Sequence, residues 1–352
     1  MKNSLWGKSK GSGEISSIVL LRGIASLMVC LFHMSVGNPQ YLPENNWLRQ
    51  IGNYGWTGVE VFFVISGFVI PYSMFVKQYA TRDFWAFLKK RIIRIEPPYL
   101  VSIVLVILLN YISTLSPYYR GAPYHPDWGN IAGHVAYLNV FTGGKWVNDV
   151  YWSLAIEFQY YILIALTFKL IVADNRFVRL GFFVAFALSS ALLPGYLQFI
   201  FTWAAFFMLG ILLFQYVCKI ISQWEFLIMG VAIIAFSYYR HGTILTAISL
   251  GALLVILYVN RFPAWLRFFG TISYSLYLIH IPIGGRIINL SENFIHNTNV
   301  RVVLVFVGIA VSVVCAALYY RFIEKPFKSR AAMIRYDRPA ITEPTALSPT
   351  AK

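Results

Sequence analysis

Two ionisable side chains stand within a long apolar run near the start of the sequence. The run covers residues 15–36 (ISSIVLLRGIASLMVCLFHMSV), with Arg22 near one end and His33 near the other. A run of this length can cross a bilayer as a helix, where an ionisable group is costly unless it is paired or used. At about 100° per residue the two side chains point within about 20° of each other, about 16 Å apart along the axis.

Small residues separate these two groups on the same helix face: Ser26, Val29 and Cys30. We therefore expect a polar groove along this helix that suits a long, thin ligand with charge at one end. The alternative is that the arginine reaches the inner lipid headgroups and the histidine lies at the outer interface, with no shared role.

Three further titratable residues lie in other apolar runs: Glu60 in GVEVFFVISGF, Glu157 in YWSLAIEFQYY and His280 in SYSLYLIHIP. Measured from the outer ends of their predicted spans, Glu60 is about 7 Å deep and Glu157 about 9 Å deep. His280 falls near or beyond the midplane. We expect all three to lie at a depth similar to that of His33, where carboxyl and imidazole groups in contact can perform acid–base chemistry. Each could instead be a structural hydrogen-bonding group between helices.

The most basic part of the chain lies between residues 77 and 98 and contains Lys89, Lys90, Arg91 and Arg94. Arg91 and Arg94 are three residues apart and so share a helix face. We expect a short helix here that is capped by Asp83 and ends at Pro97 and Pro98. The cluster can bind phosphate groups, although topology and attraction to anionic lipids would produce the same pattern.

The composition places the chain among membrane proteins. Of 352 residues, 58% are hydrophobic and only 12% are charged, which predicts an all-α, polytopic integral membrane protein. The formal net charge of +15 does not indicate nucleic acid in such a chain, because Lys and Arg gather in cytoplasmic loops. The three cysteines form no CxxC pair, so we expect neither a disulfide framework nor a metal site.

Apolar runs predict about ten transmembrane helices, at residues 15–36, 55–76, 97–115, 150–170, 179–194, 197–216, 224–239, 243–260, 270–289 and 300–322. With both termini in the cytoplasm, about 22 Lys and Arg residues lie inside and about six outside, which fixes the expected orientation. We expect a cytoplasmic segment at 1–14, a membrane domain at 15–328 and a disordered cytoplasmic tail at 329–352.

The longest outer loop, residues 116–150, is rich in aromatic residues and contains Asp127 and Asp149. Its middle, IAGHVAYLNVF, is expected to form a short helix at the membrane interface. The aromatic residues are either an interfacial belt, which is usual at that depth, or a platform for an acceptor, since flat aromatic faces with nearby carboxylates suit sugars.

Six motifs in order make the chain similar to the acyltransferase 3 family over residues 15–326: RGIASLMVCLFH, GVEVFFVISGF, RIIR, YWSLAIEFQYY, SYSLYLIH and YRFIEKP. The hallmark motifs of that family match the Arg22–His33 spacing and the Arg91–Arg94 pair. Its members are membrane acyltransferases that commonly modify hydroxyls of bacterial surface glycans. Glu60 stands where many members carry Asp. No soluble hydrolase-like domain follows the last span, so acyl transfer is expected to be completed within the membrane part.

The resemblance implies acetyl-CoA, or a related acyl-CoA, as the donor. Its phosphates would be held at the inner face by the basic cluster: Arg91, Arg94, Lys89 and Lys90. The pantetheine arm would then run along the first helix, past Arg22 and Ser26.

The resemblance also implies roles on the outer side. His33 would act as general base on a hydroxyl of an extracytoplasmic or lipid-linked glycan, with Glu60 or Glu157 orienting it or stabilising its imidazolium. Tyr277 and His280 would bind the thioester carbonyl or shape the pocket. The protein would lie in the inner membrane of a bacterium, among its lipids.

Other functions use the same residues. A proton-coupled transporter could use the buried Glu and His groups, although no repeated halves with paired broken helices are visible in the sequence. A non-catalytic scaffold could bind anionic lipids through the basic cluster. An enzyme with another acyl group or acceptor is the remaining alternative.

Overall fold

The computed structural model describes residues 15–119, 123–193, 198–259 and 261–336. The elements within these ranges are helices. The longer ones are α1 (Ser16–Ser35), α3 (Gly58–Val76), α4 (Phe84–Thr114), α7 (Tyr151–Ile171), α8 (Arg176–Leu192), α9 (Ala204–Val217), α10 (Gln223–Tyr258), α11 (Leu266–His280) and α13 (Thr298–Tyr319). The shorter ones are α2 (Trp47–Gly52), α5 (Trp128–His134), α6 (Asn139–Thr142), α12 (Arg286–Glu292) and α14 (Lys325–Met333).

Seven stretches of the described residues are long and apolar enough to cross a membrane, judged by length and composition. They are Ser16–Ser35, Trp47–Val76, Thr81–Thr114, Tyr151–Ile171, Ile200–Val217, Gln223–Tyr258 and Thr298–Met333. The all-α, multi-pass class expected from the sequence is thus confirmed. Two of the predicted spans fall on one element, α10, which is broken at Gly242 (φ 76°).

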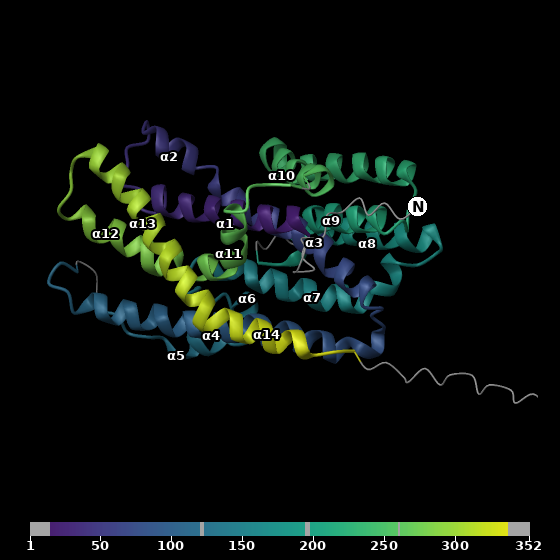
Figure 1. Ribbon diagram of the computed structural model, residues 1–352, viewed down its shortest axis with the longest axis horizontal. Coiled ribbons are helices and arrows are strands. Elements are labelled where there is room, and N and C mark those ends of the chain that lie inside the picture. Colours follow the sequence, from purple (N-terminus) through teal and green to yellow (C-terminus); the bar gives the residue numbers. More distant parts are fainter. Residues whose placement is uncertain (1–14, 120–122, 194–197, 260, 337–352) are drawn as a thin grey trace, which may run out of the picture.

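The long helices lie side by side, with α1 near the middle, α10 on one side and α4 on the other (Figure 1). α1 packs mainly against α11 and α3, and α3 packs against α9. The short helices α2 and α12 lie at one end of the molecule, whereas α4 begins and α14 ends at the opposite end (Figure 1). This arrangement brings α1, α3, α4, α7 and α11 around a common interior.

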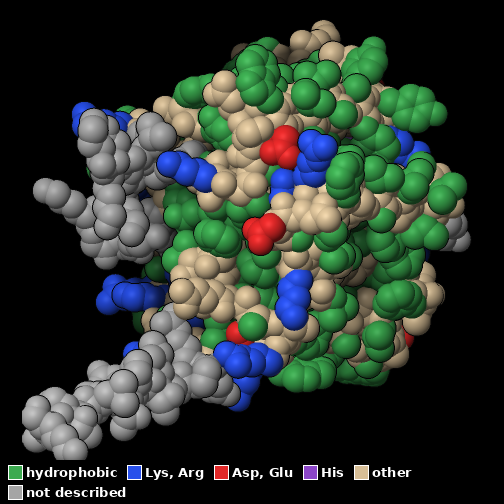
Figure 2. All heavy atoms as spheres, turned by 90° about the vertical axis from the view of Figure 1, so that its right-hand side faces the viewer, with side chains coloured by type: hydrophobic (Ala, Val, Ile, Leu, Met, Phe, Trp, Pro, Cys, Tyr) green, Lys and Arg blue, Asp and Glu red, His purple; other side chains and the backbone are tan. Residues whose placement is uncertain are grey.

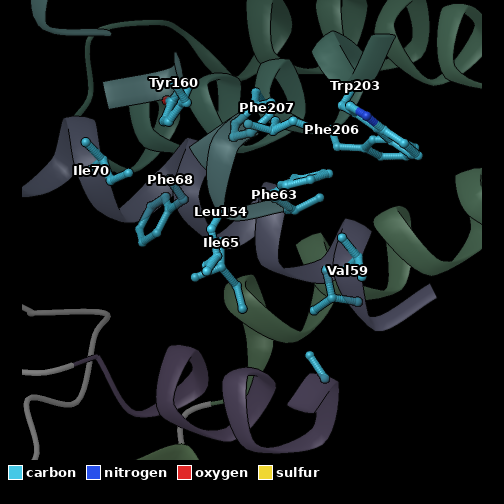
Figure 3. Close-up of a cluster of buried hydrophobic side chains, with 14 of the residues drawn as sticks. Val59, Phe63, Ile65, Phe68, Ile70, Leu154, Tyr160, Trp203, Phe206 and Phe207 are labelled. Atoms are coloured by element: carbon cyan, nitrogen blue, oxygen red, sulfur yellow. The ribbon is translucent and has the colours of Figure 1, made fainter. Parts of the chain in front are cut away.

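Aromatic side chains and glycines hold the centre of the bundle together. Phe63, Phe207 and Tyr160 pack face to face or tilted between α3, α7 and α9 (Figure 3). The backbones of α3 and α9 approach closely at Gly67 and Gly210, where a Cβ on Gly210 would lie 2.3 Å from the Val64 carbonyl oxygen. Such small-residue contacts are typical of helix pairs in membranes.

The predicted helix end at Pro97 and Pro98 is wrong, because α4 continues through both prolines to Thr114. Tyrosines from two neighbouring helices bind this part of α4: the Tyr274 hydroxyl donates to the Ile95 carbonyl at 2.9 Å, and the Tyr319 hydroxyl donates to the Pro98 carbonyl at 2.5 Å. Membrane helices tolerate proline because neighbouring helices and local backbone adjustments compensate for the hydrogen bonds that it removes.

Two further segments have bounds in the structure that differ from the predicted ones. The loop segment expected as one short helix forms two, α5 and α6, because Tyr137 between them has a left-handed backbone (φ 55°). At the C-terminal side, α14 continues to Met333, beyond the predicted domain boundary at residue 328. The N-terminal segment 1–14 and the rest of the predicted tail, residues 337–352, lie outside the described residues.

Candidate active site

His33 of α1 and His280 of α11 form a pair of imidazoles. The Nε2 atom of His280 lies 3.2 Å from Nδ1 of His33. Each Nδ1 also lies 2.9 Å from a backbone carbonyl one turn earlier, that of Val29 for His33 and that of Leu276 for His280. Because a carbonyl oxygen only accepts, this network assigns a hydrogen to each Nδ1. The single Nδ1–H of His33 is then shared between the nearer Val29 carbonyl oxygen and Nε2 of His280, and the lone pair of His33 is on Nε2.

The imidazole ring of His33 lines a cavity, here called the outer cavity. Its other walls include Glu60, Asp149, Lys145 and Gln198 and the aromatic residues Phe32, Trp56, Trp146, Trp152, Trp203 and Tyr277. Glu60 is fully buried, and among the described residues neither of its carboxylate oxygens has a hydrogen-bond partner. The outer cavity therefore combines a base, an unpartnered carboxyl group and flat aromatic faces.

A structural histidine holds the loop between α4 and α7 against this cavity. His134 is fully buried, and its Nε2 accepts a hydrogen bond from the Val147 N–H at 3.0 Å. Burial lowers the pKa of His134, which keeps this nitrogen available as an acceptor. Trp146 and Asp149 flank the bound amide and line the outer cavity. Part of the aromatic loop thus faces His33, as the platform interpretation requires.

A second cavity, the inner cavity, lies beside the first and contains the arginines. Arg22, Arg91 and Arg94 line it together with Glu157 and Glu324. They reach it from α1, α4, α7 and the π-helical segment Tyr320–Glu324 that follows α13. Three cations facing one cavity suit a polyanionic ligand.

Aromatic and hydroxyl groups fix several of these charged side chains. The Arg91 guanidinium lies 5.3 Å from the ring centres of both Phe87 and Tyr161. The Tyr161 hydroxyl donates to Glu157 at 2.5 Å. Glu324 accepts hydrogen bonds from the Ser275 hydroxyl at 2.6 Å and the Ser275 N–H at 3.2 Å.

Val59 and Tyr277 line both cavities and so form the partition between them. The Tyr277 hydroxyl is 2.6 Å from that of Ser153 and 3.2 Å from the Val150 carbonyl oxygen. The continuous groove expected along the first helix is therefore divided in two.

The division lies at the middle of α1, where α3 packs closely on it. A Cβ on Gly58 would lie 2.5 Å from the carbonyl oxygen of Ala25, so the two backbones leave no room for a groove. Ser26 is fully buried, binds the Gly23 carbonyl at 3.0 Å and lines neither cavity. Its predicted place beside the pantetheine arm does not fit this packing.

The structure sorts the predicted site residues into separate groups. His33 and Glu60 share the outer cavity. Glu157 does not share it, because it lies in the inner cavity with the arginines. His280 is fully buried behind His33 and lines neither cavity, so it is not placed to bind a thioester.

The two lysines of the basic cluster do not join the arginines. Lys89 is exposed and lines neither cavity, and Lys90 lies in a separate cleft next to residues that follow α14. The shared helix face of Arg91 and Arg94 is confirmed, because both line the inner cavity.

Sequence reasoning missed Glu324 and Tyr161 as members of the inner cavity. Glu324 carried a usable signal, since an acid directly after a long apolar run is expensive unless it is paired. Nothing local in the sequence marks Tyr161, because aromatic residues are common throughout this chain.

Fold and site together define a multi-pass helical membrane protein with a histidine base in one cavity and an arginine cluster in the next. The chain belongs to the acyltransferase 3 family, whose model, described as an acyltransferase domain, matches residues 15–321. This confirms the resemblance seen in the motifs.

Relatives in Staphylococcus aureus carry acetyltransferase names. The chain is 26% identical to SACOL0978 of strain COL, which is provisionally named as an O-acetyltransferase, over 91% of this chain and 58% of that protein. It is also 26% identical to the O-acetyltransferase OatA of strain NCTC 8325, over 88% of this chain and 56% of that protein. The chain thus spans a little over half the length of these relatives. No solved structure matches it.

Proposed function

We propose that this protein is a membrane O-acyltransferase that moves an acetyl or related acyl group from acyl-CoA to a hydroxyl of an extracytoplasmic or lipid-linked glycan. The observation that carries the proposal is the pair of adjoining cavities. Arginines line one, a histidine base lines the other, and only Val59 and Tyr277 are common to both. Family membership and the names of the relatives support an acyl transfer as the chemistry.

In the proposed reaction, Nε2 of His33 takes the proton of the acceptor hydroxyl as the oxygen attacks the thioester carbon. The carbon–sulfur bond then breaks, the new ester forms, and the imidazolium returns its proton to the thiolate of CoA. His280 would support the charged His33 together with the Val29 carbonyl oxygen, because the two acceptors share the Nδ1–H of His33 at 3.2 Å and 2.9 Å. This is the part that a carboxylate plays in other histidine bases.

The donor would bind in the inner cavity, with its phosphates near Arg91 and Arg94. Guanidinium groups bind phosphate oxygens through charge-assisted hydrogen bonds, and Arg22 offers a further cation along the same wall. The thioester would reach His33 past Tyr277. The acceptor would enter the outer cavity, where Trp56, Trp146 and Asp149 suit a sugar ring.

We propose ten membrane crossings, both termini in the cytoplasm and a place in the inner membrane of a bacterium. The bias of Lys and Arg supports this orientation. Lys and Arg side chains surround the end of the molecule at which α4 begins and α14 ends (Figure 2). The two halves of α10, which meet at Gly242, would count as separate crossings.

The proposal is tested by incubating the purified protein, in nanodiscs, with radiolabelled acetyl-CoA and lipid-linked glycan extracts. Label that moves into the glycan fraction with wild type and not with His33→Ala supports it. Thermal stabilisation by acetyl-CoA is a second readout, since a ligand that binds the folded state raises its stability. Absence of both label transfer and stabilisation would end the proposal.

A further inference from the structure

A basic cleft lies apart from the two cavities. Lys77 and Lys90 line it together with Ile334, Arg335 and Tyr336. Lys77 directly follows α3, Lys90 is on α4 and the other three follow α14. Three segments of the chain therefore converge on one cleft.

The charges around this cleft are unbalanced. Three cations line it, and among the described residues no acidic side chain does. The ammonium groups of Lys77 and Lys90 are close enough to repel each other, and the charge of Arg91 adds to the positive potential at Lys90. Asp83, in the adjoining turn, accepts a hydrogen bond from the Ala80 N–H at 2.9 Å and does not line the cleft. Three like charges that converge on one cleft create a site for an anion.

Contacts between the three segments hold the residues of the cleft in place. The Lys90 ammonium donates to the Ile334 carbonyl oxygen at 3.2 Å. The ring of Tyr336 packs edge-on against that of Tyr79, with 5.8 Å between centroids. These contacts fix the segment after α14 against α3 and α4 and place an aromatic ring beside the cations.

A chain of packed aromatic side chains places this cleft close to the inner cavity. The Tyr79 ring lies 5.7 Å from that of Phe87, and the Phe87 ring lies 5.3 Å from the Arg91 guanidinium. Arg91 lines the inner cavity. Lys90 precedes Arg94 by one helical turn, a rise of about 6 Å along α4. Cations thus continue from the cleft into the cavity.

We propose that this cleft binds the phosphorylated ribose at the adenosine end of acyl-CoA, while the rest of the molecule extends past Arg91 into the inner cavity. This inference rests on the proposed function. A phosphate among three cations gains charge-assisted hydrogen bonds, and a purine can stack on an aromatic ring such as that of Tyr336. An anionic lipid headgroup has the same phosphate chemistry, so the experiment separates these two sources.

The test compares CoA with dephospho-CoA, which lacks the phosphate on the ribose. Binding of each is measured by calorimetry to the full chain in nanodiscs of neutral phosphatidylcholine, and again with anionic lipid added. We expect wild type to bind CoA about tenfold more tightly than dephospho-CoA. The double variant Lys77→Gln, Arg335→Gln should bind both ligands equally, with its affinity for dephospho-CoA unchanged.

The matched control is Arg82→Gln, which removes an exposed cation near the start of α4 that does not line the cleft. It should keep the wild-type preference for CoA. Equal binding of the two ligands by wild type would overturn this inference but not the proposed function. A preference for CoA that survives in the double variant would do the same. An effect of the double variant confined to anionic nanodiscs would assign the cleft to lipid and also overturn it. If wild type bound neither ligand, the proposed function would fail as well.

Discussion

Nε2 of His280 lies 3.2 Å from Nδ1 of His33, so one imidazole supports another across the contact between α11 and α1. A neutral imidazole can accept this hydrogen bond and remains uncharged in the interior. A buried carboxylate in the same place would need further partners to compensate for its desolvation. The histidine pair thus orients a base without adding a formal charge to the bundle.

Removing the acceptor behind His33 should impair catalysis without removing donor binding. We expect His280→Leu to lower acyl transfer by about 10-fold or more, because Nδ1–H of His33 keeps the Val29 carbonyl but loses its second acceptor, which would stabilise the imidazolium. His280→Gln, which keeps an acceptor oxygen, should recover part of the loss. Transfer rates and acyl-CoA affinity are measured for both. Equal losses in the two variants would indicate a packing role only.

His33 itself should be indispensable for transfer and dispensable for donor binding. We expect His33→Ala to abolish label transfer and to change acyl-CoA affinity less than about threefold, since the arginines lie in the other cavity. Equilibrium binding and transfer assays on the same preparation check this. A large loss of affinity would place the donor phosphates beside His33 and contradict the two-cavity arrangement.

Arg91 and Arg94 should dominate the affinity for acyl-CoA. Hydrogen bonds to charged groups contribute about 1.5–3 kcal/mol each, so the double variant Arg91→Gln, Arg94→Gln should weaken binding by about 100-fold or more. Lys169→Gln, an exposed cation in the last turn of α7, is the matched control and should bind normally. Unchanged binding by the double variant would refute the phosphate role of the arginine pair.

Tyr277 should keep water away from the thioester. In Tyr277→Ala the partition between the cavities loses its ring, so we expect hydrolysis of acyl-CoA without acceptor to rise several-fold relative to transfer. Tyr277→Phe keeps the ring, so in this variant breakdown of acyl-CoA should still depend on the acceptor. Release of free thiol, measured with and without acceptor, tests this. Full coupling in the alanine variant would show that Tyr277 does not separate the two cavities in function.

The α3–α9 contact should be intolerant of a single added carbon. A Cβ on Gly210 would lie 2.3 Å from the Val64 carbonyl oxygen, and overpacking of this kind typically costs about 1–3 kcal/mol. We expect Gly210→Ala to lower the Tm in nanodiscs. Gly251→Ala in α10, where nothing lies within 4 Å of the new carbon, should leave the Tm unchanged or raise it slightly. Equal Tm values would show that the contact can relax.

The sequence alone determined the class of the protein and the positions of its helices. Apolar runs are local signals, and the ten predicted segments fall on helices, although α4 begins well before the predicted start at residue 97 and two segments share α10. The Arg91–Arg94 pair was also predictable, since residues three apart on a helix share a face regardless of what surrounds it. The motifs then indicated the family.

Tertiary structure decided which groups meet. Glu157 was expected beside His33 from its depth, but the packing of α7 turns it toward the arginines, and His280 takes the place next to His33. The groove along α1 is closed at Ser26 because Gly58 lets α3 approach. The rotation of one helix against another depends on contacts between residues distant in sequence, and no local periodicity encodes those contacts.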